Sequence, residues 1–244
     1  FTTAALRNAK NSAAAVGEIE QRTGLTIRVI TGDEEAIFDF IGATRNLQEE
    51  SGLLVDIGGG STEIVNYQQR RIQHKISLRI GSLAFRTKYV QGILPTAGEC
   101  LVMREQAENA IQSATAFNAV SELSMAGIGG TFKGAAALYN AMFNQPASNN
   151  RMEARRLKTI IATFQQDHGL TQDMSVMLMR TVADRINTII PGLIIADVLA
   201  RRFQSKIITY SDSGVREGYI YDQIIGNKKG SSGIPVGKKC RCPL

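Results

Sequence analysis

The most informative part of the sequence is Leu53-Leu54-Val55-Asp56-Ile57-Gly58-Gly59-Gly60-Ser61-Thr62-Glu63-Ile64-Val65. An apolar run ends in a carboxylate, passes through three glycines and two hydroxyls to a second carboxylate, and becomes apolar again. This pattern predicts a strand, a tight turn and a second strand. Glycines have no Cβ, so the backbone of such a turn can approach a ligand and direct successive N–H groups at phosphoryl oxygens. Asp56 and Glu63 stand at the two ends of the turn, and carboxylate oxygens are ligands that Mg²⁺ prefers.

A plain hairpin is the structural alternative for this stretch. A two-residue hairpin turn needs only one or two glycines, so three glycines followed by Ser-Thr-Glu exceed what a hairpin requires. A Walker loop needs Lys-Ser or Lys-Thr after its last glycine, and this turn has no lysine. A dinucleotide-binding loop runs into a helix, whereas Ile64 and Val65 indicate a strand. A turn that binds phosphate and magnesium is therefore the favoured interpretation.

The composition is that of a folded protein without a basic nucleic-acid-binding face. With 244 residues, of which 43% are hydrophobic, the chain can bury a substantial core in one large domain or two lobes. The formal net charge is +6, but residues 228–244 contain five Lys or Arg and no acid. Residues 1–227 therefore carry 23 positive and 22 negative charges, and no nucleic-acid partner is indicated. We expect the basic tail, 228–244, to be disordered.

The small number of cysteines and the lack of a long apolar run favour a cytoplasmic location. Cys100, Cys240 and Cys242 are too few and too unevenly placed for a disulfide framework, which indicates a reducing compartment. We find no signal peptide and no apolar run near the roughly 20 residues that span a bilayer, so no membrane association is expected. The chain opens without methionine on Phe1-Thr2-Thr3, which has the pattern of a strand end. We therefore expect that a preceding segment is absent.

The segment before the glycine turn contains a second pair of acids. A helix is predicted from Ala13 to Gln21, closing at Gly24, and a strand from Leu25 to Ile30. Thr31 and Glu34 then form a capping box at the start of the next helix. That role accounts for Glu34 and leaves Glu35 free to serve either as a surface acid or as part of a site.

A second glycine cluster, Gly127-Ile128-Gly129-Gly130-Thr131, lies between a short apolar strand and a helix expected over 133–143. A helix N-terminus after a glycine loop can bind an anion, although the glycines could also serve close packing of helix and strand. Further strands are predicted at 71–80 and 206–210, and further helices at 81–89, 98–118 and 215–225.

Four motifs together resemble the exopolyphosphatase and guanosine pentaphosphate phosphohydrolase family. They are Asp56-x-Gly-Gly-Gly-Ser-Thr-Glu63, Gly32-Asp-Glu-Glu-Ala36, Gly127-x-Gly-Gly-Thr131 and Gly214-Val-Arg-Glu-Gly218, and the resemblance extends to about Ile225. It implies an α/β protein with the actin-like, ribonuclease H-like ATPase fold, in which two lobes enclose the site in their cleft. Residues 1–46 would be the remainder of an N-terminally incomplete first lobe, 47–212 the second lobe, and 213–227 a helix returning to the first.

The resemblance also implies roles for individual residues. Glu35 matches the catalytic base, Arg7 matches an arginine at the site, and Asp56 and Glu63 match the residues that hold Mg²⁺ and the phosphate end of the substrate. The phosphate-binding residues predicted from the two glycine clusters are Gly58, Gly59, Gly60, Ser61, Thr62, Gly129, Gly130 and Thr131.

The implied activity is Mg²⁺-dependent hydrolysis of the terminal phosphate of inorganic polyphosphate or guanosine pentaphosphate, in the bacterial stringent response. Three departures from the family pattern leave alternatives open. The first phosphate loop of the family is missing, Ile37 stands where an arginine is usual, and Asn187 replaces a carboxylate. A non-catalytic sensor of polyphosphate or guanosine tetraphosphate is the second hypothesis, and a sugar-kinase-like ATPase is the third. The oligomeric state stays open, with a homodimer among the possibilities.

Overall fold

A computed structural model describes residues 1–226, so the predicted tail, with Cys240 and Cys242, lies outside the described residues. The strands are β1 (Gly52–Ile57), β2 (Thr62–Gln68), β3 (Arg71–Leu78), β4 (Ser124–Ile128), β5 (Arg151–Glu153) and β6 (Ile207–Tyr210). The α-helices are α1 (Ala4–Arg7), α2 (Ser12–Thr23), α3 (Gly32–Ala43), α4 (Ser82–Tyr89), α5 (Ala97–Gln112), α6 (Gly129–Met142), α7 (Leu157–Thr163), α8 (Gln172–Thr181), α9 (Ile186–Arg202) and α10 (Val215–Tyr219). A π-helical segment, Ile220–Ile225, continues α10.

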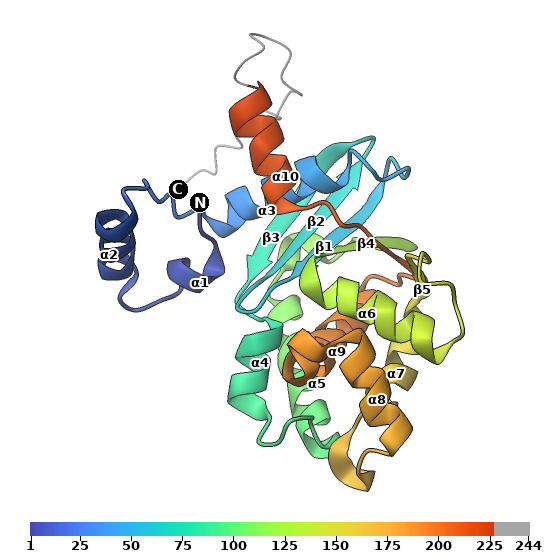
Figure 1. The fold of residues 1–244 in the computed structure, drawn as a ribbon. Helices are drawn as coiled ribbons and strands as arrows, with labels where there is room; N and C mark the ends of the chain where they lie inside the picture. The colour runs from blue at the N-terminus through green and yellow to red at the C-terminus, as the bar shows by residue number, and fades with distance from the viewer. Residues whose placement is uncertain (227–244) are drawn as a thin grey trace.

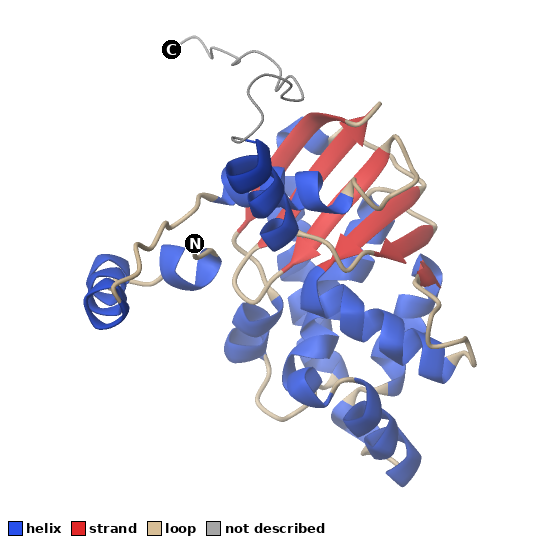
Figure 2. Ribbon diagram, turned by 45° about the horizontal axis from the view of Figure 1, so that its top comes forward, coloured by secondary structure: helices blue, strands red, loops and turns tan. Residues whose placement is uncertain are grey.

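The six strands form one mixed sheet in the order β3-β2-β1-β4-β6-β5 (Figures 1 and 2). β1, β4 and β6 are parallel, whereas β2, β3 and β5 are antiparallel to their neighbours. The carboxyl ends of parallel strands meet at one edge of a sheet. The glycine turn after β1, the second glycine cluster after β4 and Ser211 after β6 therefore lie along the same edge.

Helices cover both faces of the sheet, and each face has its own core. On one face, α4 to α9 share a large hydrophobic core. Most of α9 is surrounded by other residues, since every residue from Ile189 to Ala200 is buried. On the other face α3 packs Ala36, Phe40 and Ala43 against strand residues that include Leu54 and Tyr67. Burying two faces of one sheet is how an α/β domain stabilises a partly parallel sheet, which agrees with the predicted fold class. Within the described residues no helix has both the length and the apolar character needed to cross a bilayer.

Glycines set the contact between α3 and α10. A Cβ at Gly42 would come within 2.1 Å of the Gly214 carbonyl oxygen, and one at Gly218 within 1.8 Å of the Phe38 carbonyl oxygen. Only glycine fits such an approach of two backbones. The C-terminal helix thus returns to the helix that precedes β1. The lobe boundaries predicted at 46 and 212 stay predictions.

The strand predicted over Leu25–Ile30 is wrong. The described residues contain only an isolated parallel bridge between Thr2 and Val29, with the Thr2 N–H donating to Arg28 O at 2.8 Å. A strand needs a ladder partner along its length, and within the described residues this segment pairs only at Val29. α2 buries no residue and lies apart from the sheet in both views (Figures 1 and 2). Other differences are smaller: α6 begins at Gly129 rather than 133, and the three-residue edge strand β5 was not predicted.

We predict that Gly218→Ala destabilises the protein by more than about 2 kcal/mol, because the new methyl group would overlap the Phe38 carbonyl. Gly17→Ala is the matched control. Gly17 lies within α2 with nothing within 4 Å of its Cβ position, so alanine should leave stability unchanged or raise it by up to about 1 kcal/mol. Denaturant titrations measure both effects. Equal stabilities for the two variants would contradict the proposed role of the α3–α10 contact.

Candidate active site

The start of α3 separates the roles of two neighbouring acids, as the sequence predicted. Thr31 Oγ1 accepts a hydrogen bond from the Glu34 N–H at 3.1 Å, and Glu34 Oε2 accepts one from the Thr31 N–H at 2.8 Å. Glu34 also pairs with Arg28 on the surface. These contacts hold Glu34 outside, so the next residue on the helix, Glu35, points inward and is only 6% exposed.

Arg7 connects Glu35 to the glycine turn. Its Nη1 donates to Glu35 Oε2 at 2.8 Å and to the backbone oxygen of Ile30 at 3.0 Å. Its Nη2 lies 3.8 Å from Glu63 Oε1. A guanidinium presents several donors in a rigid plane, which suits it to bridge two carboxylates. The structure thus brings together Arg7, Glu35 and Glu63, which are far apart in the sequence.

The two acids at the ends of the glycine turn face each other across the β1–β2 ladder. Asp56 is the direct partner of Glu63 in the antiparallel register, so both side chains project from the same face of the sheet. Glu63 is 2% exposed, and its Oε1 accepts a hydrogen bond from Ser77 Oγ of β3 at 2.6 Å. Asp56 is half-buried as a whole residue, but its carboxyl group lies against Gly129 at the start of α6, which shields it from water.

In the glycine turn, backbone carbonyl groups are hydrogen-bonded to the rest of the protein, whereas two of the N–H groups are not. Gly58 O and Gly59 O accept hydrogen bonds from the Ser82 and Ala84 N–H groups of α4, at 2.9 and 2.8 Å. The Gly58 N–H donates to Ser61 O at 3.0 Å. The N–H groups of Gly59 and Gly60 donate to no other described residue. Two adjacent free donors at a turn can receive an anion.

The hydroxyls of the two predicted threonines are already used. Thr62 Oγ1 donates to Ile80 O, and Thr131 Oγ1 donates to Ile57 O, each at 2.8 Å. Both residues are buried. Their side chains fix the ends of β1 and β2, so a phosphate-binding role for Thr62 and Thr131 would have to use the backbone.

The second glycine cluster meets the first at Asp56. Gly129 has φ +78°, and a Cβ there would come within 2.4 Å of Asp56 Oδ1. A Cβ at Gly130 would come within 2.1 Å of Arg185 Nη1, so the arginine lies over the N-terminus of α6. A helix N-terminus with an adjacent guanidinium favours anions. The sequence predicted the glycines, but it gave no sign that Arg185 would lie against them.

Asp39 is a residue at this site that sequence reasoning missed. It lies one helical turn after Glu35, so the two carboxylates share a face of α3. It is 1% exposed, and neither side-chain oxygen has a hydrogen-bond partner of normal geometry among the described residues. The available signal was a single carboxylate within the apolar helical run Ala36-Ile37-Phe38-Asp39-Phe40-Ile41. Such a charge is costly to bury.

Burial and mutual repulsion perturb the acids of the site. Burial and the charge of Glu35 raise the pKa of Glu63 from 4.5 to about 7, although Ser77, Ser61 and Arg7 oppose the shift. Burial raises the pKa of Asp56 well above its ordinary value, and Glu63 and Glu35 raise it further. Burial, Asp56, Glu63 and Glu35 raise the pKa of Asp39 in the same way, against a lowering by the Val215 N–H. Four carboxyl groups therefore interact in one small region.

These acids fit a hydrated divalent cation better than a fully protein-ligated one. Among residues 1–226 no three His, Cys, Asp or Glu side chains are grouped tightly enough to form a ready-made metal site. Mg²⁺ commonly binds through one or two carboxylates, several waters and the phosphates of a substrate. Asp56 and Glu63 suit that arrangement, because they lie opposite each other in the β1–β2 ladder and repel each other. A bound cation would relieve this repulsion.

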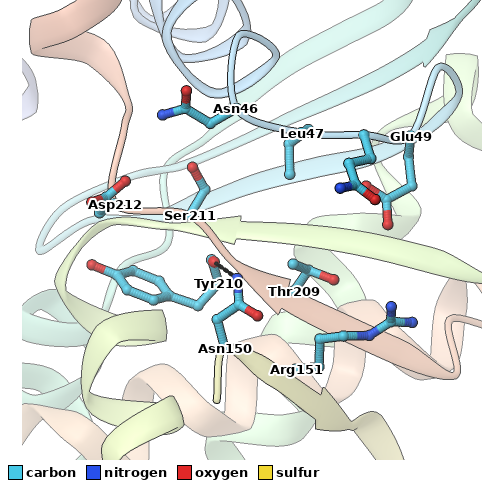
Figure 3. Close-up of a pocket in the computed structure, with 10 residues that line it drawn as sticks. Asn46, Leu47, Glu49, Asn150, Arg151, Thr209, Tyr210, Ser211 and Asp212 are labelled. Carbon is cyan, nitrogen blue, oxygen red and sulfur yellow. Dashed lines mark hydrogen bonds between the residues drawn. The ribbon is translucent and has the colours of Figure 1, made fainter. Parts of the chain in front are cut away.

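The structure also contains a cavity of about 420 Å³ that none of these acids lines (Figure 3). It is lined by the loop after α3, by β5 and β6, and by the residues that follow β6, among them Asn46, Arg151 and Asp212. Neither Glu35 nor the acids of the glycine turn contribute to it. We therefore assign the candidate active site from the acids and glycine loops.

Comparisons with known proteins decide the family. The sequence model of the Ppx/GppA phosphatase family matches residues 1–225. The chain belongs to the Ppx/GppA phosphatase family. The resemblance drawn from the four motifs is thus confirmed, and the chain is placed among hydrolases.

Individual Ppx/GppA relatives agree with this placement. Exopolyphosphatase 1 of Mycobacterium tuberculosis is 24% identical over 238 residues, which cover 95% of this chain and 68% of that protein. The guanosine-5'-triphosphate,3'-diphosphate pyrophosphatase of Pseudoalteromonas atlantica is 35% identical over 91 residues, 37% of this chain and 18% of that protein. The chain spans about two thirds of the length of the exopolyphosphatases it matches.

The Ppx/GppA fold is likewise confirmed by a solved structure. The crystal structure of the Aquifex aeolicus family member superposes with a TM-score of 0.74 at 23% identity, over 93% of this chain and 74% of that one. At this identity the likeness concerns the fold alone. It confirms that this chain has the α/β fold of the Ppx/GppA family.

We predict that the metal-free protein loses stability as the pH rises from 5 to 8. A carboxyl whose pKa is raised on folding is neutral in both states below about pH 4.5. As the pH rises towards 7 the unfolded state ionises first, which favours unfolding. The shift of Glu63 to about 7 corresponds to a loss of up to about 3 kcal/mol. Thermal unfolding with a chelator present measures it. Glu63→Gln should reduce the slope, and the raised pKa values of Asp56 and Asp39 should account for what remains. A wild-type stability that is constant or rises over this range would contradict the assignment.

Proposed function

We propose that this chain carries the catalytic site of a Mg²⁺-dependent phosphohydrolase that releases the terminal phosphate of inorganic polyphosphate or guanosine pentaphosphate. The observation that supports it most is the arrangement of Glu35, Arg7 and Glu63 beside the glycine turn, with 2.8 Å between Arg7 Nη1 and Glu35 Oε2. The names of the relatives supply the two substrate candidates.

Glu35 is the proposed general base. Arg7 occupies its Oε2 atom, which leaves Oε1 for a water molecule. A carboxylate whose orientation is fixed by an ion pair can accept a proton from that water as it attacks phosphorus in line. Because Glu34 is held in the capping box, it cannot take this role.

The glycine turn and its surroundings are the proposed phosphate site. The free N–H groups of Gly59 and Gly60 would donate to non-bridging oxygens, whose negative charge rises in the transition state. Arg7 would donate to the same group by a charge-assisted hydrogen bond. The N-terminus of α6, with Arg185 beside Gly130, would hold the following phosphate of the substrate.

Asp56 and Glu63 are the proposed magnesium ligands. When bound, Mg²⁺ supplies positive charge that neutralises the phosphate oxygens and orients them. The residues prepare for this by being paired across the ladder and by lying next to both glycine loops. Mg²⁺ and a polyphosphate or guanosine phosphate are accordingly the proposed cofactor and ligand.

We predict that Glu35→Gln in the full-length protein lowers phosphate release by about 100-fold or more, because the variant keeps the shape of the side chain but loses the base. Glu34→Gln is the matched control, since glutamine can still accept the Thr31 N–H hydrogen bond of the capping box, and this variant should retain activity. Phosphate release from polyphosphate and from guanosine pentaphosphate, each with Mg²⁺ and with chelator, is the measurement.

Several outcomes would count against this proposal. Turnover by Glu35→Gln at the wild-type rate would reject the base. Tight binding of polyphosphate or guanosine tetraphosphate by the wild-type protein without any phosphate release would instead favour the sensor hypothesis. Transfer of phosphate from ATP to a sugar would favour the kinase hypothesis.

A further inference from the structure

The burial of the Asp39 carboxyl group is explained neither by fold stability nor by the reaction proposed above. A carboxylate that is 1% exposed normally pairs with a cation or accepts several hydrogen bonds. Asp39 has no ion pair among the described residues, and both of its oxygens lack a hydrogen-bond partner of normal geometry. Replacing such a group with a neutral one would be expected to stabilise the fold, so its presence suggests a ligand.

The surroundings of Asp39 point towards the glycine turn. The charges of Asp56, Glu63 and Glu35 all act on it. On its other side, a Cβ at Gly214 would lie 3.4 Å from Asp39 Oδ1, and the Val215 N–H is the neighbouring donor. The same Cβ would lie 3.4 Å from Ile128 Cδ1, and a Cβ at the next residue, Gly129, would lie 2.4 Å from Asp56 Oδ1. Asp39 therefore lies near both the start of α10 and the acids of the glycine turn.

We propose that Asp39 is a third acidic residue of the cation site, binding Mg²⁺ through the water molecules that the ion retains. This inference rests on the magnesium site of the proposed function. Direct ligation by three carboxylates does not fit, because no three acids among the described residues are grouped that closely. Mg²⁺ gives up its water reluctantly, and a carboxylate beyond the first layer of ligands can accept hydrogen bonds from that water. The oxygens of Asp39 are suited to do so, because neither has a hydrogen bond of normal geometry within the described residues and the Val215 N–H is the one donor beside them.

The same contact would couple the cation to α10. Asp39 belongs to α3, whose backbone touches α10 at Gly42 and Gly218. With a hydrated cation in place, Asp39 can stay ionised despite its burial, and a carboxylate is favoured at the N-terminus of α10 beside the Val215 N–H. We therefore expect Mg²⁺ to stabilise the protein partly through Asp39.

Calorimetric titration of the full-length protein with Mg²⁺, in the absence of any phosphate substrate, tests the proposal. Asp39→Asn keeps the shape and an oxygen acceptor for the Val215 N–H, but it removes the negative charge. We expect it to weaken Mg²⁺ binding by about 10- to 100-fold and to raise the melting temperature of the metal-free protein. Asp39→Ala, which removes both the charge and the acceptor, should weaken binding at least as much and serves as a second variant if Asn perturbs folding.

Two control variants set the lower and upper limits of the expected effect on Mg²⁺ affinity. Asp33→Asn changes an exposed acid of the same helix, paired with Lys75, and should leave the Mg²⁺ affinity within about twofold of wild type, as expected for a screened surface charge. Asp56→Asn removes a proposed direct ligand and should weaken binding more than Asp39→Asn does.

Unchanged Mg²⁺ affinity in both Asp39 variants would overturn the inference, as would a wild-type protein that binds no Mg²⁺. A lower metal-free melting temperature for Asp39→Asn, together with unchanged affinity, would show that Asp39 serves only to hold α10. The proposed function fails separately. If the wild-type protein binds Mg²⁺ through Asp39 but releases no phosphate, the hydrolase proposal is wrong and this inference stands.

Discussion

The packing of like charges at the end of β1 is the constraint on which this structure depends. Asp56 and Glu63 oppose each other across the ladder, and α3 adds Glu35 and Asp39 to the same region. Three of these four residues are buried. Arg7 offsets part of their charge through its contacts with Glu35 and Glu63. The remaining repulsion opposes folding, which supports the proposal that this site binds a cation and a phosphate group.

The rest of the fold keeps these acids in place. The capping box of Thr31 fixes where α3 begins, and therefore which acid faces inward. Gly42 and Gly218 allow the backbones of α3 and α10 to come into direct contact. On the opposite face, the large core under α9 supports β1 and β4, whose carboxyl ends carry the two glycine loops. A site with internal repulsion needs this support, because buried charges would otherwise separate and take up water.

Local signals predicted much of this from the sequence. The glycine turn, the capping box and the helix stop at Gly24 each depend on residues within a few positions, and all three are present. The family motifs predicted the actin-like fold. Contacts between segments that are distant in the sequence could not be predicted in this way. Neither the lack of a ladder partner along Leu25–Ile30 nor the position of Arg185 over Gly130 follows from local pattern, because each depends on which neighbour the tertiary structure supplies. Asp39 had a faint signal, an acid in an apolar helical run, that periodicity alone did not separate from a surface charge.

The most direct test of this account is to locate a bound cation. Crystals of the full-length protein containing Mn²⁺, which substitutes for Mg²⁺ and scatters anomalously, would reveal its position. The account predicts an anomalous peak about 2 Å from a carboxylate oxygen of Asp56 or Glu63, beside the glycine turn. A peak elsewhere in the molecule, with no density between these two residues at saturating Mn²⁺, would contradict it.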